Sequence, residues 1–310
     1  MEKAMKIYEE VKKAVIGKDD IIIKILTVML ARGHVLLEDI PGVGKTNLAL
    51  AFSKAIGLNT KRVQFTPDVM PSDVIGYSIY NQKTQEFEYK QGAAMTNLFL
   101  ADEINRTSSK TQSALLEIME EGKISVDGQT HTIPKPFMVI ATQNPFGSAG
   151  TQLLPDSQMD RFMVRLSIGY PNREAEIEML KRKQNHNPID DIQTVSCPEH
   201  IIEMQTAVDQ VYLDESIYKY MVDLVVQTRQ HSGILQGGSP RSTLALCAMT
   251  KATAFLHGRD YVIPQDVQEV FIDVLEHRII LTNEAKLNQQ STKKILKSIM
   301  ENIVMPSIKK

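Results

Sequence analysis

The sequence feature that most limits the possible folds is a glycine-rich segment at residues 39–46, which reads Asp-Ile-Pro-Gly-Val-Gly-Lys-Thr. It follows an apolar run at 35–37 and opens a helical pattern that stops at Gly57. Glycines allow backbone N–H groups to surround phosphates, and the helix dipole adds attraction. Lys45 can reach the β and γ phosphates, and the Thr46 hydroxyl can bind Mg²⁺. The segment predicts a phosphate-binding loop, although Asp39 stands where the usual pattern has its first glycine.

Apolar runs and helical patterns alternate through the first half of the chain. Residues 35–37, 98–101 and 137–141 have the continuous apolar character of strands that are buried on both faces of a parallel sheet. Residues 46–56 and 110–121 have helical spacing, and each pattern stops at a glycine. This alternation predicts an α/β fold, a P-loop nucleotide-binding domain with a doubly wound parallel sheet.

Two insertions interrupt the alternation. In the first, β-like runs at 76–80 and 87–90 flank a polar stretch. In the second, Asp127-Gly128 separates two short β-like runs, and this dipeptide favours tight hairpin turns. We therefore expect hairpins within about residues 70–95 and 123–135.

The pattern changes after Pro171. Period-3.6 spacing dominates from residue 173 onward, for example over 215–230, and no strand pattern is evident. The polar stretch 184–188 is typical of a linker. We expect a nucleotide-binding core over residues 1–183, a linker over 184–205 and an all-α lid domain over 206–310.

Composition narrows the class of protein. Of the 310 residues, 43% are hydrophobic and 23% are charged, as in ordinary globular chains. Lys and Arg number 35 against 37 Asp and Glu, so the net charge of −2 gives no overall attraction to nucleic acid. The two cysteines, Cys197 and Cys247, are too few for a disulfide framework or a metal set. A globular chain of about two domains is expected.

The location of the protein is also constrained. The N-terminal residues 1–6 are charged and lack a signal-peptide pattern. The apolar run 21–31 contains Lys24 and is shorter than the roughly 20 residues that a membrane span requires. We expect a cytoplasmic protein without a transmembrane segment.

Two carboxylates follow the second apolar run. Asp102 and Glu103 come directly after residues 98–101, at the carboxyl end of an expected strand. Asp102 can hold a magnesium-bound water, and Glu103 can polarise the water that attacks a phosphate. Carboxylates beside an apolar strand are costly without such partners. The pair predicts the hydrolytic half of a nucleotide site; the alternative is that one acid merely caps the next helix.

A further polar residue follows the third apolar run. Asn144 is expected to lie beside Asp102, where it can orient the attacking water or contact the γ phosphate. By itself, the dipeptide Asn144-Pro145 is more typical of a turn.

Arginines supply the cations that a developing phosphoryl charge requires. The candidates are Arg161, Arg241 and Arg106, although a single arginine is usually an exposed surface residue. Ser239 occupies an expected N-cap and Pro240 the first helical position, which places Arg241 in the first turn of a lid helix.

Five motifs, in this order, resemble the MoxR family of AAA+ ATPases, within the clade that has a helix-2 insert. The resemblance covers nearly the whole chain. The motifs are EDIPGVGKT at 38–46, LADEINR at 100–106, ATQNP at 141–145, LPDSQMDRF at 154–162 and GSPR at 238–241.

The resemblance implies a role for each candidate residue. The adenine would be bordered by Val15, Ile16 and Gly17. The Walker A segment implies phosphate binding by Pro41, Gly42, Val43, Gly44, Lys45, Thr46 and Asn47. Thr46 and Asp102 would hold the metal. Catalytic roles are implied for Glu103 in Walker B, Asn144 as sensor 1, Arg161 as the arginine finger and Arg241 as sensor 2.

The resemblance also implies assembly and partners. In similar proteins the arginine finger reaches the nucleotide of a neighbouring subunit, so Arg161 implies a homo-oligomeric ring, typically a hexamer. The two insertions correspond to the helix-2 insert and the pre-sensor-1 hairpin. ATP and Mg²⁺ are the implied cofactors. Family members are viewed as chaperone-like remodellers, often with a partner that has a von Willebrand factor A domain, so ATP hydrolysis coupled to remodelling or maturation of a protein is implied.

Two alternatives remain open at this point. One is an AAA+ motor stimulated by nucleic acid, for which Lys123, His131 and Lys135 supply limited positive charge and the chain has no Trp for stacking. The other is a nucleotide-gated scaffold with little turnover, which would have no need for Glu103. GTP is a weaker substrate candidate, because the sequence has no Asn-Lys-x-Asp motif.

Overall fold

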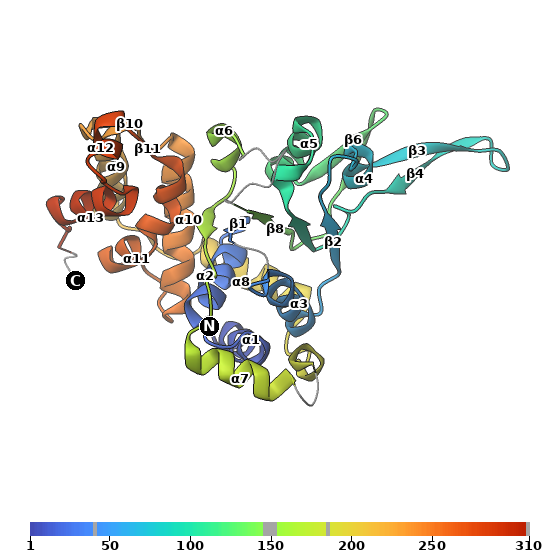
Figure 1. The fold of residues 1–310 in the computed structure, drawn as a ribbon, viewed down its shortest axis with the longest axis horizontal. Helices are drawn as coiled ribbons and strands as arrows, with labels where there is room; N and C mark the ends of the chain where they lie inside the picture. The colour runs from blue at the N-terminus through green and yellow to red at the C-terminus, as the bar shows by residue number, and fades with distance from the viewer. Residues whose placement is uncertain (40–41, 145–153, 184–186, 308–310) are drawn as a thin grey trace.

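Five parallel strands form the centre of the protein in the computed structural model, which describes residues 1–39, 42–144, 154–183 and 187–307 (Figure 1). Their order across the sheet is β2-β5-β8-β1-β9. The strands are β1 (Val35–Glu38), β2 (Thr60–Gln64), β5 (Leu98–Asp102), β8 (Met138–Gln143) and β9 (Val164–Leu166). Because every neighbouring pair is parallel, all five strands begin at one side, here called the N-terminal edge, and finish at the opposite C-terminal edge.

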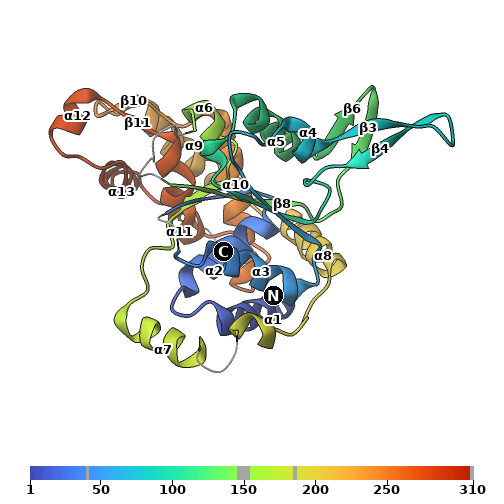
Figure 2. The same ribbon diagram turned by 45° about the vertical axis from the view of Figure 1, so that its right-hand side comes forward.

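Side chains of the central strands alternate between two hydrophobic cores. Leu37 and Leu100 pack in the core formed with α1 (Glu2–Ala14), α2 (Asp19–Leu30) and α3 (Lys45–Ile56). Leu36 and Phe99 pack in the core on the other face, which includes buried residues of α5 (Ser109–Glu121). Figure 2 shows the helices on both sides of the sheet. The predicted doubly wound α/β architecture is therefore confirmed.

Two strands of the sheet have no matching apolar run in the sequence. β2 lies at the border of the sheet, and its side chains are mostly exposed or half-buried, so it lacks the signal of a strand buried on both faces. β9 has only three residues. Both strands are stabilised by pairing with β5 and β1, respectively, rather than by their own hydrophobicity.

Both predicted hairpins are present. β3 (Gly76–Asn81) pairs with β4 (Glu86–Gln91), and β6 (Lys123–Val126) pairs with β7 (Gln129–Thr132). The short helix α4 (Pro71–Ile75) precedes the first hairpin. In Figures 1 and 2 the β3–β4 hairpin extends well away from the rest of the protein.

The second half of the chain is helical. Its helices are α6 (Asp156–Met159), α7 (Arg173–Lys183), α8 (Pro198–Asp209), α9 (Glu215–Gln230), α10 (Pro240–Leu256), α11 (Pro264–Leu275), α12 (Asn283–Leu287) and α13 (Thr292–Asn302), with the one-turn 3₁₀ segments η2 (Pro188–Asp191) and η3 (Glu276–Arg278). A further 3₁₀ segment, η1 (Ile104–Arg106), follows β5 in the first half of the chain. The expectation of a lid without strands needs one correction. β10 (Ile234–Gln236) pairs with β11 (Ile280–Leu281). These strands are too short to produce a periodic pattern, and pairing between distant segments forms them.

Helix α8 connects the core to the lid. It begins at Pro198, inside the interval 184–205 expected to be a linker; residues 184–186 lie outside the described part of the chain. The side-chain amide of Gln205 in α8 donates a hydrogen bond to the carbonyl oxygen of Met29 in α2 at 2.8 Å. Ile201, Met204 and Val208 are buried at helical spacing. α8 therefore packs on the core as well as leading into the lid.

Candidate active site

A pocket lies at the C-terminal edge of the sheet, where the phosphate loop and three strands meet. Its lining residues are Gly42, Gly44, Lys45, Thr46, Asn47, Arg62, Gln64, Asp102, Glu103, Thr142 and Asn144. Apart from Arg62 in the middle of β2 and the residues at the start of α3, these positions lie at or directly after the ends of β1, β2, β5 and β8. Parallel topology therefore brings together the phosphate-loop, acidic and Asn144 positions that the sequence placed after separate strands.

The loop between β1 and α3 takes a form suited to phosphates. Gly42 and Gly44 have φ angles of +89° and +93°, which L side chains rarely adopt. A Cβ atom at either position would meet no atom within 4 Å, so the requirement for glycine comes from the backbone conformation. Pro41 lies outside the described residues.

Lys45 lies at the first position of α3 and points back across this loop. Its Nζ donates a hydrogen bond to the carbonyl oxygen of Asp39 at 2.8 Å. Partial burial lowers the pKa of Lys45 below its ordinary value, while Asp39, Asp102 and Glu103 oppose this shift. A partly desolvated ammonium interacts more strongly with an anion than an exposed one does.

Asp39, which replaces the usual first glycine, anchors the start of the loop. Its Oδ2 accepts hydrogen bonds from the backbone N–H groups of Ile168 and Gly169, the latter at 2.8 Å, and from Ser167 Oγ at 3.2 Å. These donors follow β9, the strand next to β1. The carboxylate thus fixes the phosphate loop to the neighbouring strand connection, a role that a glycine cannot fill.

The same connection also holds the segment proposed to border the adenine. Lys18 Nζ donates a hydrogen bond to the carbonyl oxygen of Tyr170 at 2.9 Å. Gly17 has a φ of +70°, and a Cβ there would lie 2.8 Å from the Cβ of Ala175 in α7. Val15 packs against the same hydrophobic core as Val43 of the phosphate loop. Val15, Ile16 and Gly17 do not line the phosphate pocket itself.

Asp102 is buried at the end of β5 and has two partners. Arg62 Nε of β2 donates to its Oδ2 at 2.7 Å, and Thr142 Oγ1 of β8 donates to its Oδ1 at 3.2 Å. The Thr142 hydroxyl oxygen also accepts a hydrogen bond from the backbone N–H of Glu103 at 2.8 Å. Thr142 therefore ties together the ends of two adjacent strands and fixes both acidic positions.

Glu103 has an unusual backbone conformation. Its φ of 54° and ψ of 48° lie in the left-handed region, which is rare for residues other than glycine and is often found at functional sites. Its carboxylate accepts a hydrogen bond from Arg106 Nη1 at 2.6 Å. The strained turn directs the side chain into the pocket instead of continuing the strand.

The donor set of the pocket fits a magnesium ion accompanying a nucleotide. The Thr46 hydroxyl and the Asp102 carboxylate offer oxygen ligands, which Mg²⁺ prefers, while phosphates and waters complete its usual coordination. The Arg62 guanidinium lies 2.7 Å from the Asp102 carboxylate, so a positive charge already accompanies this acid, as a divalent cation would. Among the described residues, the pocket included, no group of three or more His, Cys, Asp or Glu residues is placed to hold a metal ion by itself.

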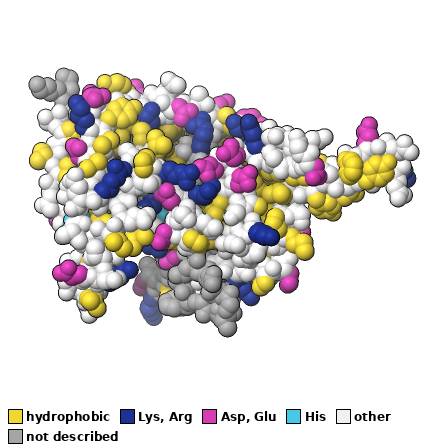
Figure 3. Space-filling model, turned by 90° about the horizontal axis from the view of Figure 1, so that it is seen from above, with side chains coloured by type: hydrophobic (Ala, Val, Ile, Leu, Met, Phe, Trp, Pro, Cys, Tyr) yellow, Lys and Arg dark blue, Asp and Glu magenta, His cyan; other side chains and the backbone are white. Residues whose placement is uncertain are grey.

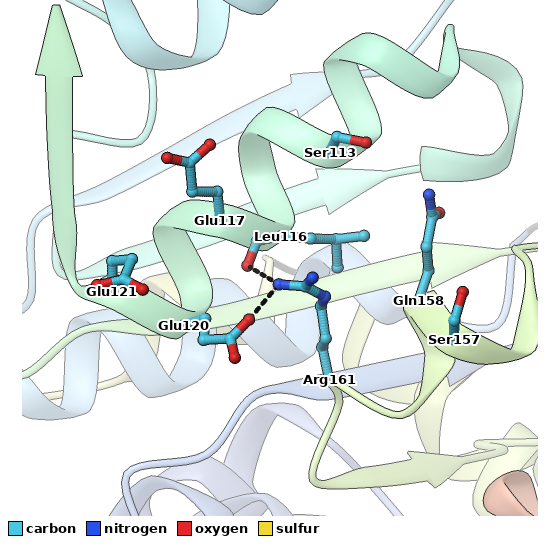
Figure 4. Close-up of a pocket in the computed structure, with 8 residues that line it drawn as sticks. All are labelled: Ser113, Leu116, Glu117, Glu120, Glu121, Ser157, Gln158 and Arg161. Carbon is cyan, nitrogen blue, oxygen red and sulfur yellow. Dashed lines mark hydrogen bonds and ion pairs between the residues drawn. The ribbon is translucent and has the colours of Figure 1, made fainter.

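Arg161 and Arg241 lie outside the phosphate pocket. Arg161 comes just before β9 begins, so it lies at the N-terminal edge, whereas Lys45 follows the end of the adjacent strand β1. Arg161 Nη1 pairs with Glu120 of α5 and donates to the carbonyl oxygen of Leu116 at 3.4 Å (Figure 4). Arg241 Nη2 pairs with the same Glu120. The two arginines predicted to act on phosphate are together, but at the wrong edge for their own phosphate loop.

Several functional candidates were absent from the sequence predictions. Arg62 and Thr142 contact Asp102, and Glu120 contacts both arginines. Glu120 belongs to a run of acids at the end of a helix, a pattern that usually means a solvated face. Arg62 lies in a strand that the sequence did not reveal. Arg106, weighed as a cation for phosphate, pairs with Glu103 instead.

Family comparisons agree with the fold. A family described as "ATPase family associated with various cellular activities (AAA)" matches residues 34–164, and one described as "AAA lid domain" matches residues 226–299. Within the described part of the chain, no helix has the length and apolar character needed to cross a membrane.

Individual proteins are similar over most of the chain. "Uncharacterized protein YeaC" of Bacillus subtilis is 48% identical, over 97% of this chain and 94% of its own length. "Chaperone MoxR1" of Mycobacterium tuberculosis is 38% identical, over 96% of this chain and 81% of its own. "Protein MoxR" of Methylorubrum extorquens is 27% identical over 98% and 95%, respectively. The crystal structure of a putative ATPase from Cytophaga hutchinsonii superposes with a TM-score of 0.91 at 38% identity, covering 99% of this chain and 96% of that one.

Proposed function

Because the chain belongs to the MoxR family of AAA+ ATPases, we propose that it hydrolyses ATP with Mg²⁺ at the interfaces of a ring of identical subunits and uses this reaction to remodel a partner protein. One observation carries the proposal. Lys45, Asp102 and Glu103 share one pocket, while Arg161 lies at the opposite edge of the same sheet. Each protomer thus has both halves of a phosphoryl-transfer site, but the two halves lie at opposite edges of its sheet.

The residues of the phosphate pocket divide the chemistry among them. Backbone N–H groups of the loop and the Lys45 ammonium bind the phosphates, and partial burial strengthens the Lys45 contact. Glu103 orients the attacking water and accepts its proton, since its carboxylate projects into the pocket from a strained turn. Asn144 lines the same pocket and can hold the water or the γ phosphate in line.

Thr46 and Asp102 are the residues that would hold the magnesium ion. When bound, Mg²⁺ supplies charge neutralisation for the phosphate oxygens. Arg62 Nε lies 2.7 Å from Asp102 Oδ2. If a magnesium ion were held there, Arg62 would have to release Asp102 or share the carboxylate with the ion. Arg106 must likewise release the Glu103 carboxylate before that group accepts a proton from water.

Arg161 completes the site from a neighbouring subunit. The guanidinium stabilises charge on the transferred phosphoryl group, a contribution worth about 10³ to 10⁵ in rate in related reactions. Since its own phosphate loop is at the opposite edge of the sheet, a second copy must supply the nucleotide. A closed ring, typically a hexamer in this family, repeats that interface around an axis.

The β3–β4 hairpin supports a remodelling role rather than ATP binding alone. Tyr77, Tyr80 and Phe87 are 52%, 52% and 73% exposed, and Tyr80 packs edge to face on Phe87. Figure 3 shows this hairpin as an arm with hydrophobic side chains along it. Exposed aromatic groups on a projecting element are typical of protein contact sites. The partner, including one with a von Willebrand factor A domain, is proposed to bind here.

The experiment measures assembly and turnover together. Light scattering after size exclusion, with and without ATP and Mg²⁺, gives the number of subunits, and phosphate release gives turnover for the wild type and Lys45→Ala. Ring formation with turnover that depends on Lys45 supports the proposal. The proposal is ruled out if the wild type remains monomeric, or if Lys45→Ala releases phosphate as fast as the wild type.

A further inference from the structure

Glu120 is the common partner of the two arginines that the proposed mechanism needs. It lies in the last turn of α5, and each of its carboxylate oxygens pairs with one guanidinium, Oε2 with Arg161 and Oε1 with Arg241. Arg161 comes from the segment before β9, and Arg241 from the first turn of α10 in the lid. One carboxylate therefore joins side chains from three separate elements.

Neighbouring acids on the same helix do not share this arrangement. Glu117, Glu120 and Glu121 are all exposed, but in Figure 4 Glu117 and Glu121 point away from Arg161. Among the described residues, neither forms an ion pair with an arginine or lysine. The contact to both arginines is thus specific to Glu120 within an acidic helix end.

The backbones that carry the two arginines are joined independently of Glu120. Asp160, the residue before Arg161, accepts a hydrogen bond from Ser239 Oγ at 3.1 Å, and Ser239 is the N-cap of α10. Arg278 of η3 is buried, lies 2.8 Å from Asp160 Oδ1 through Nε, and donates to the carbonyl oxygen of Phe162 at 2.7 Å. These bonds join the segment before β9, which contains Arg161, to the lid, and the contacts of Glu120 orient the side chains of the two arginines.

The negative charge of Glu120 has an electrostatic role between the two arginines. Two guanidinium groups held close together repel each other, and a carboxylate between them offsets that repulsion. Each guanidinium has five N–H donors, of which Glu120 and Leu116 occupy only a few, so donors remain for phosphate oxygens. We propose that Glu120 is a positioning residue that holds Arg161 and Arg241 as one convergent cationic pair for the triphosphate of a neighbouring subunit.

This inference rests on the proposed function and adds a residue to it. Glu120 touches neither nucleotide nor water; it acts through the arginines. Loss of its charge should lower the rate of the chemical step and leave nucleotide binding at the Lys45 pocket unchanged. A residue that merely stabilised α5 would instead alter the melting temperature and would change both quantities or neither.

The test compares Glu120→Gln with Glu121→Gln in the full-length protein. Both substitutions keep side-chain size and remove one negative charge from the last turn of α5, so effects through the helix dipole are matched. Measurements are kcat and KM for phosphate release, affinity for a fluorescent ATP analogue, and melting temperature. We expect Glu120→Gln to lower kcat about 10- to 100-fold, the range typical for residues that orient catalytic groups. Affinity and melting temperature should match those of Glu121→Gln, which should turn over like the wild type.

Subunit mixing locates the defect. Glu120→Gln subunits retain the phosphate pocket, and Lys45→Ala subunits retain Glu120 and both arginines. Mixed assemblies should recover turnover, because interfaces form that join the intact pocket of one variant to the intact arginine pair of the other. Three results would overturn the inference: equal kcat for the two glutamine variants, a faster Glu120→Gln variant, or no recovery on mixing. Lack of Lys45-dependent turnover in the wild type would overturn the proposed function itself, and the role of Glu120 with it.

Discussion

The two edges of the central sheet differ in how completely they are built. The C-terminal edge gathers the phosphate loop, Asp102, Glu103 and Asn144 into one pocket. The N-terminal edge gathers Arg161 and Arg241 around Glu120, and the phosphate loop lies at the other edge. Figure 3 shows basic and acidic side chains next to one another near the middle of the face of the molecule that it draws.

The difference follows from the topology. In a parallel sheet, residues after the strands meet at one edge, and residues before the strands meet at the other. Lys45 follows β1, and Arg161 precedes β9, so the fold itself separates them. In the proposed mechanism, the two half-sites become a whole site when a second copy of the chain brings opposite edges together.

Removing Arg161, the proposed arginine finger, should have the largest effect. Arg161→Ala is expected to lower turnover about 10³- to 10⁵-fold, because the cation that stabilises the transferred phosphoryl group is lost. Binding of ATP should be unchanged, since Arg161 is not part of the Lys45 pocket. Phosphate release and a fluorescent ATP analogue measure the two quantities. If Arg161→Ala also weakened ATP binding, Arg161 would act at the Lys45 pocket, and the proposed difference between the two edges would be wrong.

Asp39→Ala should weaken the C-terminal edge through stability rather than chemistry. Asp39 is buried and accepts hydrogen bonds from Ile168, Gly169 and Ser167, and its removal leaves buried N–H groups without an acceptor. The expected loss is about 2 to 3 kcal/mol of unfolding free energy, measured by chemical denaturation. Asp39→Asn, which keeps one acceptor oxygen, should lose less. An unchanged transition midpoint in Asp39→Ala would show that the loop is held elsewhere.

A fall in pH should lower the free energy of unfolding through a group at the N-terminal edge. His34 is buried before β1, where Nδ1 accepts the N–H of Val139 at 2.9 Å and Nε2 lies 3.0 Å from the carbonyl oxygen of Met119, next to Glu120. Burial lowers the pKa of His34 to about 4. Since the folded pKa lies below the unfolded value of about 6.5, this stability is complete above pH 6.5 and is lost as pH falls from there toward 4.

The size of the acid effect follows from linkage. Between pH 7 and 5, His34 should account for about 2 kcal/mol of lost unfolding free energy. Denaturation curves of the wild type and His34→Gln at both pH values isolate this contribution, because the variant has no imidazole to titrate. Burial also lowers the pKa of His277, which contacts Phe162 at the same edge, so some acid sensitivity should persist in the variant. Equal pH dependence of the two proteins would rule out the His34 contribution.

Arg62→Ala should have the smallest effect and should change the metal requirement. In the proposed site, Arg62 and a magnesium ion would compete for Asp102, so removing the guanidinium should lower the Mg²⁺ concentration for half-maximal turnover by about fivefold, equivalent to roughly 1 kcal/mol for a partly exposed ion pair. The Lys61→Ala variant, one residue away on β2, serves as the control. A higher Mg²⁺ requirement in Arg62→Ala would show that Arg62 helps to hold Asp102 for the metal.

Sequence patterns revealed the half-site that is built from local motifs. The apolar runs before Asp102 and Asn144, and the glycines before Lys45, each predicted a strand end or a loop, and parallel topology placed them together. Both hairpins, and the N-cap position of Ser239 at the start of α10, were also predictable, although the Ser239 hydroxyl bonds to Asp160 and lies 3.5 Å from the Ser242 hydroxyl instead of capping a backbone N–H of α10.

The contacts made between distant segments left no periodic signal. Glu120 looks like a solvent-facing acid until Arg161 and Arg241 are placed beside it. Arg62 lies in β2, a border strand whose exposed side chains hide its pairing with β5. Asp39 resembles a defect in the glycine pattern, and its function depends on N–H groups more than a hundred residues later in the chain.

The most direct test of the shared site mixes two inactive proteins. Arg161→Ala subunits keep the pocket with Lys45 and Glu103, and Glu103→Gln subunits keep Arg161 at the other edge. Phosphate release is measured across a series of mixing ratios at constant total protein. The account predicts turnover that is absent from each pure variant, appears on mixing and is highest at intermediate ratios. No turnover at any ratio, with assembly of the mixed subunits verified by light scattering, would contradict a site built from two copies of the chain.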